Sequence, residues 1–148
     1  MKNLTLTCSI LLLFSTNLFS QNIQTRTGDF PEKEMKLQNK EIAKLVATEI
    51  SETLPQTIDK YTELVDVTSV NSTLLYTFEI NTGVKSDKAV INEDRTRMKR
   101  AVQTGICQSS RKFLQAGINT SYIYVSAKTK AHLFQFDVSQ KDCIKLMK

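Results

Sequence analysis

Apolar residues recur at helical spacing between Met35 and Leu54, which predicts an amphipathic helix with one face in the core. Asp29 and Pro31 are suited to the start of such a helix, and Pro55 is expected to end it. The positions expected to face the core are Met35, Ile42, Leu45, Val46, Ile50 and Leu54.

A second helical pattern begins at Asn92 or Asp94 and runs to about Gln115. Gly117 is a typical stop after a helix because it lacks a β-carbon. The expected apolar positions are Met98, Val102, Ile106 and Phe113, with Cys107 at their edge. The expected opposite face holds Arg97, Arg100, Thr104, Gln108 and Arg111.

Alternating apolar and polar residues predict two pairs of strands. The first pair covers residues 64–70 and 74–80, with Asn71 and Ser72 as the turn. The second pair lies within residues 121–138. The resulting order, α-β-β-α-β-β, predicts an α+β fold with two helices packed on one face of a four-stranded antiparallel sheet.

The first twenty residues combine one lysine, a short apolar run and a polar break, which is typical of a secretory signal peptide. The run is too short for a membrane span, which needs about 20 apolar residues. We expect cleavage after Ser20 and export to the periplasm or the extracellular space. Leu18, the third residue before this cleavage site, is larger than the small residue usual there. Retention of the uncleaved segment as a membrane anchor therefore stays open. Cys8 precedes most of the apolar core, which disfavours a lipoprotein.

Removal of residues 1–20 leaves a flexible segment, 21–33, and one α+β domain, 34–148. The formal net charge of +5 falls to +4, because the removed part holds Lys2 and no acid. Such a mild excess, without one clustered basic stripe, does not favour nucleic acid as a partner. No later segment is apolar enough for a stable membrane span.

Two cysteines, Cys107 and Cys143, remain after cleavage. In an oxidising compartment an even pair predicts a disulfide. Two free thiols are the alternative, and the absence of a Cys-x-x-Cys motif gives a thioredoxin-like role no support.

Catalytic and metal-binding patterns are weak. His132 is the single histidine, so three or four convergent zinc ligands are not indicated, and no cofactor is expected. A serine hydrolase would need His132 as its base, and no Gly-x-Ser-x-Gly motif is present. Asp59, Glu63 and Asp66 lie close in sequence, but turn and surface roles explain them better than paired-carboxylate chemistry.

Charged and aromatic residues define a candidate binding surface. Arginines on the second helix could contact an anionic partner, and two tyrosines on one strand could form an aromatic face. A solvated helix face and sheet core are the simpler explanations. The candidate residues are Arg97, Arg100, Arg111, Tyr122 and Tyr124.

One series of residues is similar to a known group. Leu54-Pro55 precedes Ile58-Asp59 and Thr62, and Cys107 and Cys143 follow at wide spacing. Over residues 54–143 the chain resembles small exported bacterial proteins and lipoproteins of uncharacterised function. The segment Lys128-Thr129-Lys130 departs from the group's Asp-Gly type of turn. The resemblance implies export and a disulfide, and it implies no catalytic residues.

These patterns favour an exported, disulfide-stabilised, non-enzymatic protein that binds another protein or a component of the cell envelope. Two other classes stay open. One is an immunity or inhibitor protein that neutralises a toxin or hydrolase, and the other is a small envelope hydrolase that uses His132.

Overall fold

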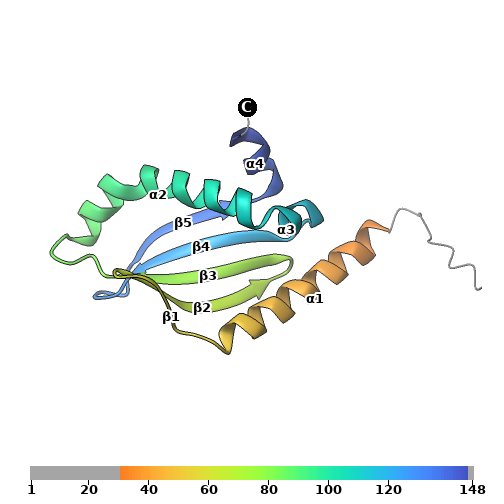
Figure 1. Ribbon diagram of the computed structural model, residues 1–148, viewed down its shortest axis with the longest axis horizontal. Helices are drawn as coiled ribbons and strands as arrows, with labels where there is room; N and C mark the ends of the chain where they lie inside the picture. Colours follow the sequence, from red (N-terminus) through yellow and green to blue (C-terminus); the bar gives the residue numbers. More distant parts are fainter. Residues whose placement is uncertain (1–30, 147–148) are drawn as a thin grey trace, which may run out of the picture.

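The computed structural model describes residues 31–146. The expected signal peptide lies outside the described residues. The chain forms one five-stranded sheet with helices before, between and after its strands (Figure 1). The elements are α1 (Glu32–Ser51), β1 (Gln56–Asp59), β2 (Thr62–Val70), β3 (Thr73–Ile80), α2 (Asp87–Ser109), α3 (Arg111–Ala116), β4 (Asn119–Ser126), β5 (His132–Val138) and α4 (Gln140–Leu146).

The α+β class is confirmed, but three details of the predicted architecture are wrong. The described residues form five strands rather than four, and four helices rather than two. The sheet is mixed, because β3 and β4 pair in parallel while the other neighbours are antiparallel. The helical connection between β3 and β4 returns the chain to the end where β3 began, which makes β4 run in the same direction.

The missed strand, β1, follows the cis peptide bond between Leu54 and Pro55. Its four residues are all exposed, so it carries no alternating pattern that could reveal it. The side chain of Asp59 accepts a hydrogen bond from the Tyr61 backbone N–H at 2.8 Å, which forms the turn into β2. Asp59 therefore has a structural role in the motif that carries the resemblance.

The predicted second helix is two helices with an earlier start. Ser86 caps α2, since its Oγ accepts a hydrogen bond from the Ala89 backbone N–H at 3.3 Å. The helix breaks at Ser110, and α3 continues to Gly117, whose φ of 90° provides the left-handed stop that was predicted.

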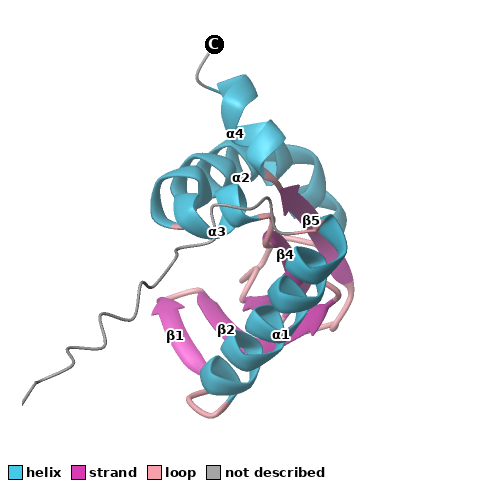
Figure 2. Ribbon diagram, turned by 90° about the vertical axis from the view of Figure 1, so that its right-hand side faces the viewer, coloured by secondary structure: helices cyan, strands magenta, loops and turns pink. Residues whose placement is uncertain are grey.

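The helices cover one face of the sheet and bury a core rich in aromatic side chains. Helix α1 packs on β2 and β3, whereas α2 packs on β5. Figure 2 shows α2, α3 and α4 grouped near β4 and β5, with α1 beside β2. Of the positions expected to face the core, Met35 and Leu45 are instead exposed, while Ala43 and Ala47 are buried. These alanines let the α1 backbone approach the sheet closely.

Candidate functional site

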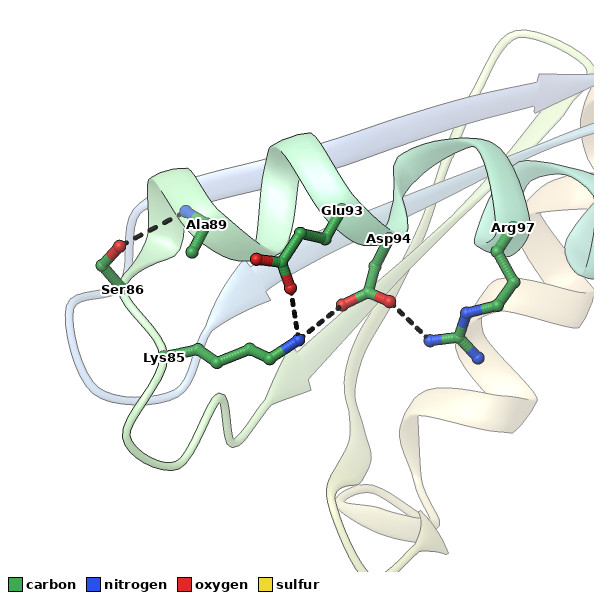
Figure 3. A network of polar contacts seen from close by, with 6 residues as sticks. All are labelled: Lys85, Ser86, Ala89, Glu93, Asp94 and Arg97. Atoms are coloured by element: carbon green, nitrogen blue, oxygen red, sulfur yellow. Dashed lines mark hydrogen bonds and ion pairs between the residues drawn. The ribbon is translucent and has the colours of Figure 1, made fainter.

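The five candidate surface residues lie in three separate places. Arg97 belongs to a polar network at the start of α2, shown in Figure 3. Arg100 and Arg111 line one groove beside the disulfide. Tyr122 and Tyr124 lie on β4 in an aromatic ladder. The structure therefore brings Arg100 and Arg111 to one place and the two tyrosines to another. Arg97 belongs to neither of these places.

The network around Arg97 stabilises the first turns of α2 (Figure 3). Arg97 donates a hydrogen bond to Asp94 at 2.7 Å, and Lys85 contacts Glu93 at 2.6 Å and Asp94 at 3.8 Å. The hydrogen bond from Arg97 lowers the pKa of Asp94, and the hydrogen bond to Glu93 raises the pKa of Lys85. The two cations and the two carboxylates form ion pairs with one another, so Arg97 has a structural role in this part of α2.

The aromatic ladder runs across the centre of the sheet. Tyr122 stacks on Tyr76 and on Phe78, with ring centroids 5.1 Å and 5.2 Å apart. Tyr124 stacks on Phe78 at 5.0 Å and contacts the rings of Phe134 and Phe136. Parallel pairing places Tyr76 opposite Tyr122, and Phe78 opposite Tyr124. The ladder thus depends on the strand pairing that the sequence prediction missed.

The two candidate tyrosines differ in exposure. Tyr124 is buried in the core, whereas Tyr122 and Tyr76 are half-buried. Burial raises the pKa of Tyr122 and that of Tyr76, and it raises the pKa of Tyr124 to about 12. All three hydroxyls therefore stay protonated and uncharged at neutral pH.

Half-buried apolar side chains from α1 and α2 pack on the same core as the half-buried Tyr76 and Tyr122. We call the set the interhelical strip. Its members are Ile42 and Val46 from α1, Tyr76 from β3, Tyr122 from β4, and Met98 and Val102 from α2. Because α1 and α2 pack on different strands, β3 and β4 run between them (Figure 1). The six side chains of the strip are uncharged and either aromatic or aliphatic.

A groove of about 870 Å³ lies at the junction of α2, α3 and α4. The structure joins Cys107 to Cys143 in a disulfide with a Cα–Cα distance of 5.4 Å, and both cysteines line the groove. Arg100 and Arg111 contribute cationic groups, and α4 contributes Ile144 and Leu146. We call this cavity the disulfide groove.

Helix α4 supplies groove residues that the sequence analysis treated only as a tail. Asp142 in the first turn of α4 binds back to Ser139, because both the backbone N–H and the hydroxyl of Ser139 donate to Asp142 Oδ2, at 3.0 Å and 2.6 Å. These hydrogen bonds lower the pKa of Asp142. The Ser-x-x-Asp spacing is the sequence signal that could have revealed this helix.

The residues considered for catalysis do not converge. His132 is exposed at the start of β5 and lines none of the described cavities. Asp59 and Glu63 line a shallow cavity near the β1–β2 turn, and Asp66 is not part of it. Within residues 31–146, no group of three or more histidine, cysteine or acidic side chains is arranged to hold a metal ion. No helix in the described part of the chain is long and apolar enough to cross a membrane.

Comparison with solved structures identifies proteins of similar fold. A protein of Pseudomonas aeruginosa described as a candidate secreted protein has 15% identity and a TM-score of 0.62, over 74% of this chain and 96% of that one. The pilotin EpsS of the Vibrio vulnificus type 2 secretion system has 16% identity and a TM-score of 0.60, over 75% and 96%. The pilotin AspS of the Vibrio cholerae type II secretion system has 19% identity and a TM-score of 0.58, over 75% and 97%.

Comparisons of the sequence itself give one match. Residues 37–134, about two thirds of the chain, match a family described as a domain of unknown function, DUF8479. No curated protein matches the chain.

Proposed function

The chain belongs to the DUF8479 domain family, and we propose that it is an exported, non-enzymatic accessory protein that binds an apolar segment of another cell-envelope protein. The expected signal peptide supports export. The similarity in fold to two pilotins of secretion systems supports an accessory role in the envelope.

The interhelical strip is the observation that carries the proposal. Partly exposed Tyr76 and Tyr122 lie between the helices, and aliphatic side chains of α1 and α2 border them. Large aromatic side chains that stay partly exposed are enriched in protein-binding surfaces, because they bury much area with little loss of conformational freedom. An amphipathic segment could place its apolar face on the strip.

The chemistry of the strip favours a peptide over a charged polymer. Its six side chains carry no charge at neutral pH, where tyrosine hydroxyls are protonated. A nucleic acid or an anionic polysaccharide would instead require a row of cations. Burial of apolar area would provide the main driving force for the binding of an apolar peptide segment.

Charge placed in the strip provides the test. Met98 is half-buried on α2, and the long stem of a lysine can follow a similar path while its ammonium group reaches water. Met98→Lys should therefore fold and lower affinity for the envelope partner by about tenfold or more. Ala101→Lys introduces the same charge at an exposed position of α2 and serves as the matched control.

The measurement has two stages. The partner is first identified by cross-linking in intact cells, and its binding is then measured with purified proteins by calorimetry. The proposal requires Met98→Lys to bind more weakly than both the wild type and Ala101→Lys. Equal affinity of all three proteins, with thermal unfolding unchanged, would exclude the strip as the binding surface.

A further inference from the structure

We propose that the disulfide groove is a second binding site, which takes an acidic, amphipathic peptide segment. The site shares no lining residue with the interhelical strip, so this inference is independent of the proposed function. The unpaired arginines and the exposed apolar lining of the groove support this site.

Two cations on the groove wall have no counterion among the described residues. Arg100 and Arg111 are exposed, and neither belongs to an ion pair within residues 31–146. Among residues 31–146, no acidic side chain lines the groove. The nearby Asp142 carboxylate is held by Ser139. Arg97, which lies on α2 like Arg100, differs from both because it forms an ion pair with Asp94.

The groove also exposes apolar surface that water does not solvate well. Ile144 and Leu146 are 45% and 46% exposed although both lie on the wall of a cavity of about 870 Å³. Leu114, which is buried, contributes to the lining. A ligand that carries only charge would leave this surface uncovered, whereas an amphipathic ligand would bury it.

The two arginines belong to different helices but line the same groove. Arg100 lies on α2 and Arg111 on α3, on either side of the break at Ser110. A ligand would meet both with two carboxylates, and apolar residues between the carboxylates would cover Ile144 and Leu146. Each carboxylate could accept two parallel hydrogen bonds from a guanidinium group.

The disulfide attaches the wall of the groove that α4 forms. Helix α4 has no buried residue, and Cys143 joins it covalently to Cys107 of α2. The bond holds α4 against the end of α2 and so shapes one wall of the groove. Reduction should weaken binding of the acidic peptide more than binding at the interhelical strip, because Val102 and Tyr122 of the strip pack near the cysteines but do not line the groove.

Fluorescence anisotropy with defined peptides tests the site. The probes are amphipathic helical peptides of about 16 residues, with leucines on one face and one glutamate at each end of that face. Each has a twin in which glutamine replaces glutamate. We expect the glutamate peptide to bind about tenfold more tightly than its twin, and Arg100→Gln with Arg111→Gln to abolish that difference.

Arg97→Gln is the matched control, because it removes the same charge from α2 outside the groove. It should retain the preference for glutamate. Equal losses in Arg97→Gln and in the double variant would overturn the site in favour of general charge attraction. A second outcome would overturn the site in favour of a lipid surface. In that outcome the protein binds phosphatidylglycerol vesicles but binds the glutamate and glutamine peptides equally.

Discussion

The two ends of the helical layer are attached to the sheet by different means. Helix α1 is held by close packing, since Ala43 and Ala47 are 0% and 5% exposed and Ser51 donates a hydrogen bond to the Val67 carbonyl at 2.8 Å. Helix α4 buries no residue and depends on the bond between Cys107 and Cys143. Packing of small side chains attaches a long helix, whereas a short terminal helix requires a covalent link.

The difference also separates the two proposed binding surfaces. The interhelical strip includes residues of α1, so its shape depends on the alanine packing. The disulfide groove includes residues of α4, so its shape depends on the disulfide. A perturbation at α1 should therefore change mainly the strip, and a perturbation of the disulfide should change mainly the groove, although Val102 and Tyr122 of the strip pack on the same cluster as the cysteines.

Removal of the disulfide should have the largest effect on stability. The bond joins residues 36 positions apart, and closing a loop of this length stabilises the folded state by about 3–4 kcal/mol in the chain-entropy model. Replacement of both cysteines by serine should lower the free energy of unfolding by about that amount, measured by denaturant unfolding. Amide exchange should accelerate first in α4, and an unchanged rate there would contradict the account.

An enlarged side chain at the α1 contact should have the next largest effect. Ala43 has no exposed surface, so Ala43→Leu must push α1 away from β2 and β3. Overpacking of this kind costs about 1–3 kcal/mol. Lys44→Leu is the control at the adjacent exposed position, and denaturant unfolding of both variants gives the comparison. Equal stability of the two variants would contradict close packing at Ala43.

One side-chain hydrogen bond connects α1 to α3, and its loss should cost less. Asn39 of α1 is buried, and its Nδ2 donates to the Ala116 carbonyl at the end of α3, at 2.6 Å. Asn39→Ala leaves this carbonyl without its side-chain donor and should lower stability by about 1–2 kcal/mol. Amide exchange would show increased opening at both α1 and α3. Increased amide exchange restricted to α1 would argue against a connection between α1 and α3.

Acid should produce the smallest and most local change. Ser139 stabilises the ionised form of Asp142, so its folded pKa lies below the ordinary value of 3.8. The stabilisation from the Ser139–Asp142 hydrogen bonds is therefore fully present above that value and is lost as pH falls through the lower folded pKa. NMR titration should show loosening of α4 at acid pH. Asp142→Asn should remove this transition, and an unchanged transition in that variant would assign it to another group.

Local sequence patterns predicted the elements whose burial alternates or repeats. The strand from Thr73 to Ile80 and the turn at Asn71 and Ser72 were predicted because one face is apolar and the turn residues are polar. The strand from Gln56 to Asp59 was missed because all four residues are exposed. No local pattern specifies that β3 and β4 pair in parallel, since that depends on the path of α2 and α3.

The candidate binding residues also depend on long-range contacts that local sequence patterns do not specify. Tyr122 could be selected from its strand, but its stacking partner Tyr76 comes from a strand 46 positions earlier and meets it only through the parallel pairing. Arg97, Arg100 and Arg111 look equivalent in the sequence. The structure distinguishes them, because Asp94 pairs with Arg97 while the other two line the groove.

Site-specific photo-cross-linking in cells tests the central claim most directly. A benzophenone amino acid would replace Tyr76 in the interhelical strip or, as a control, Tyr61, which is 55% exposed in the turn between β1 and β2. The account predicts one discrete adduct with an envelope protein from position 76 and none from position 61. Adducts of equal yield from both positions, or from position 61 alone, would contradict it.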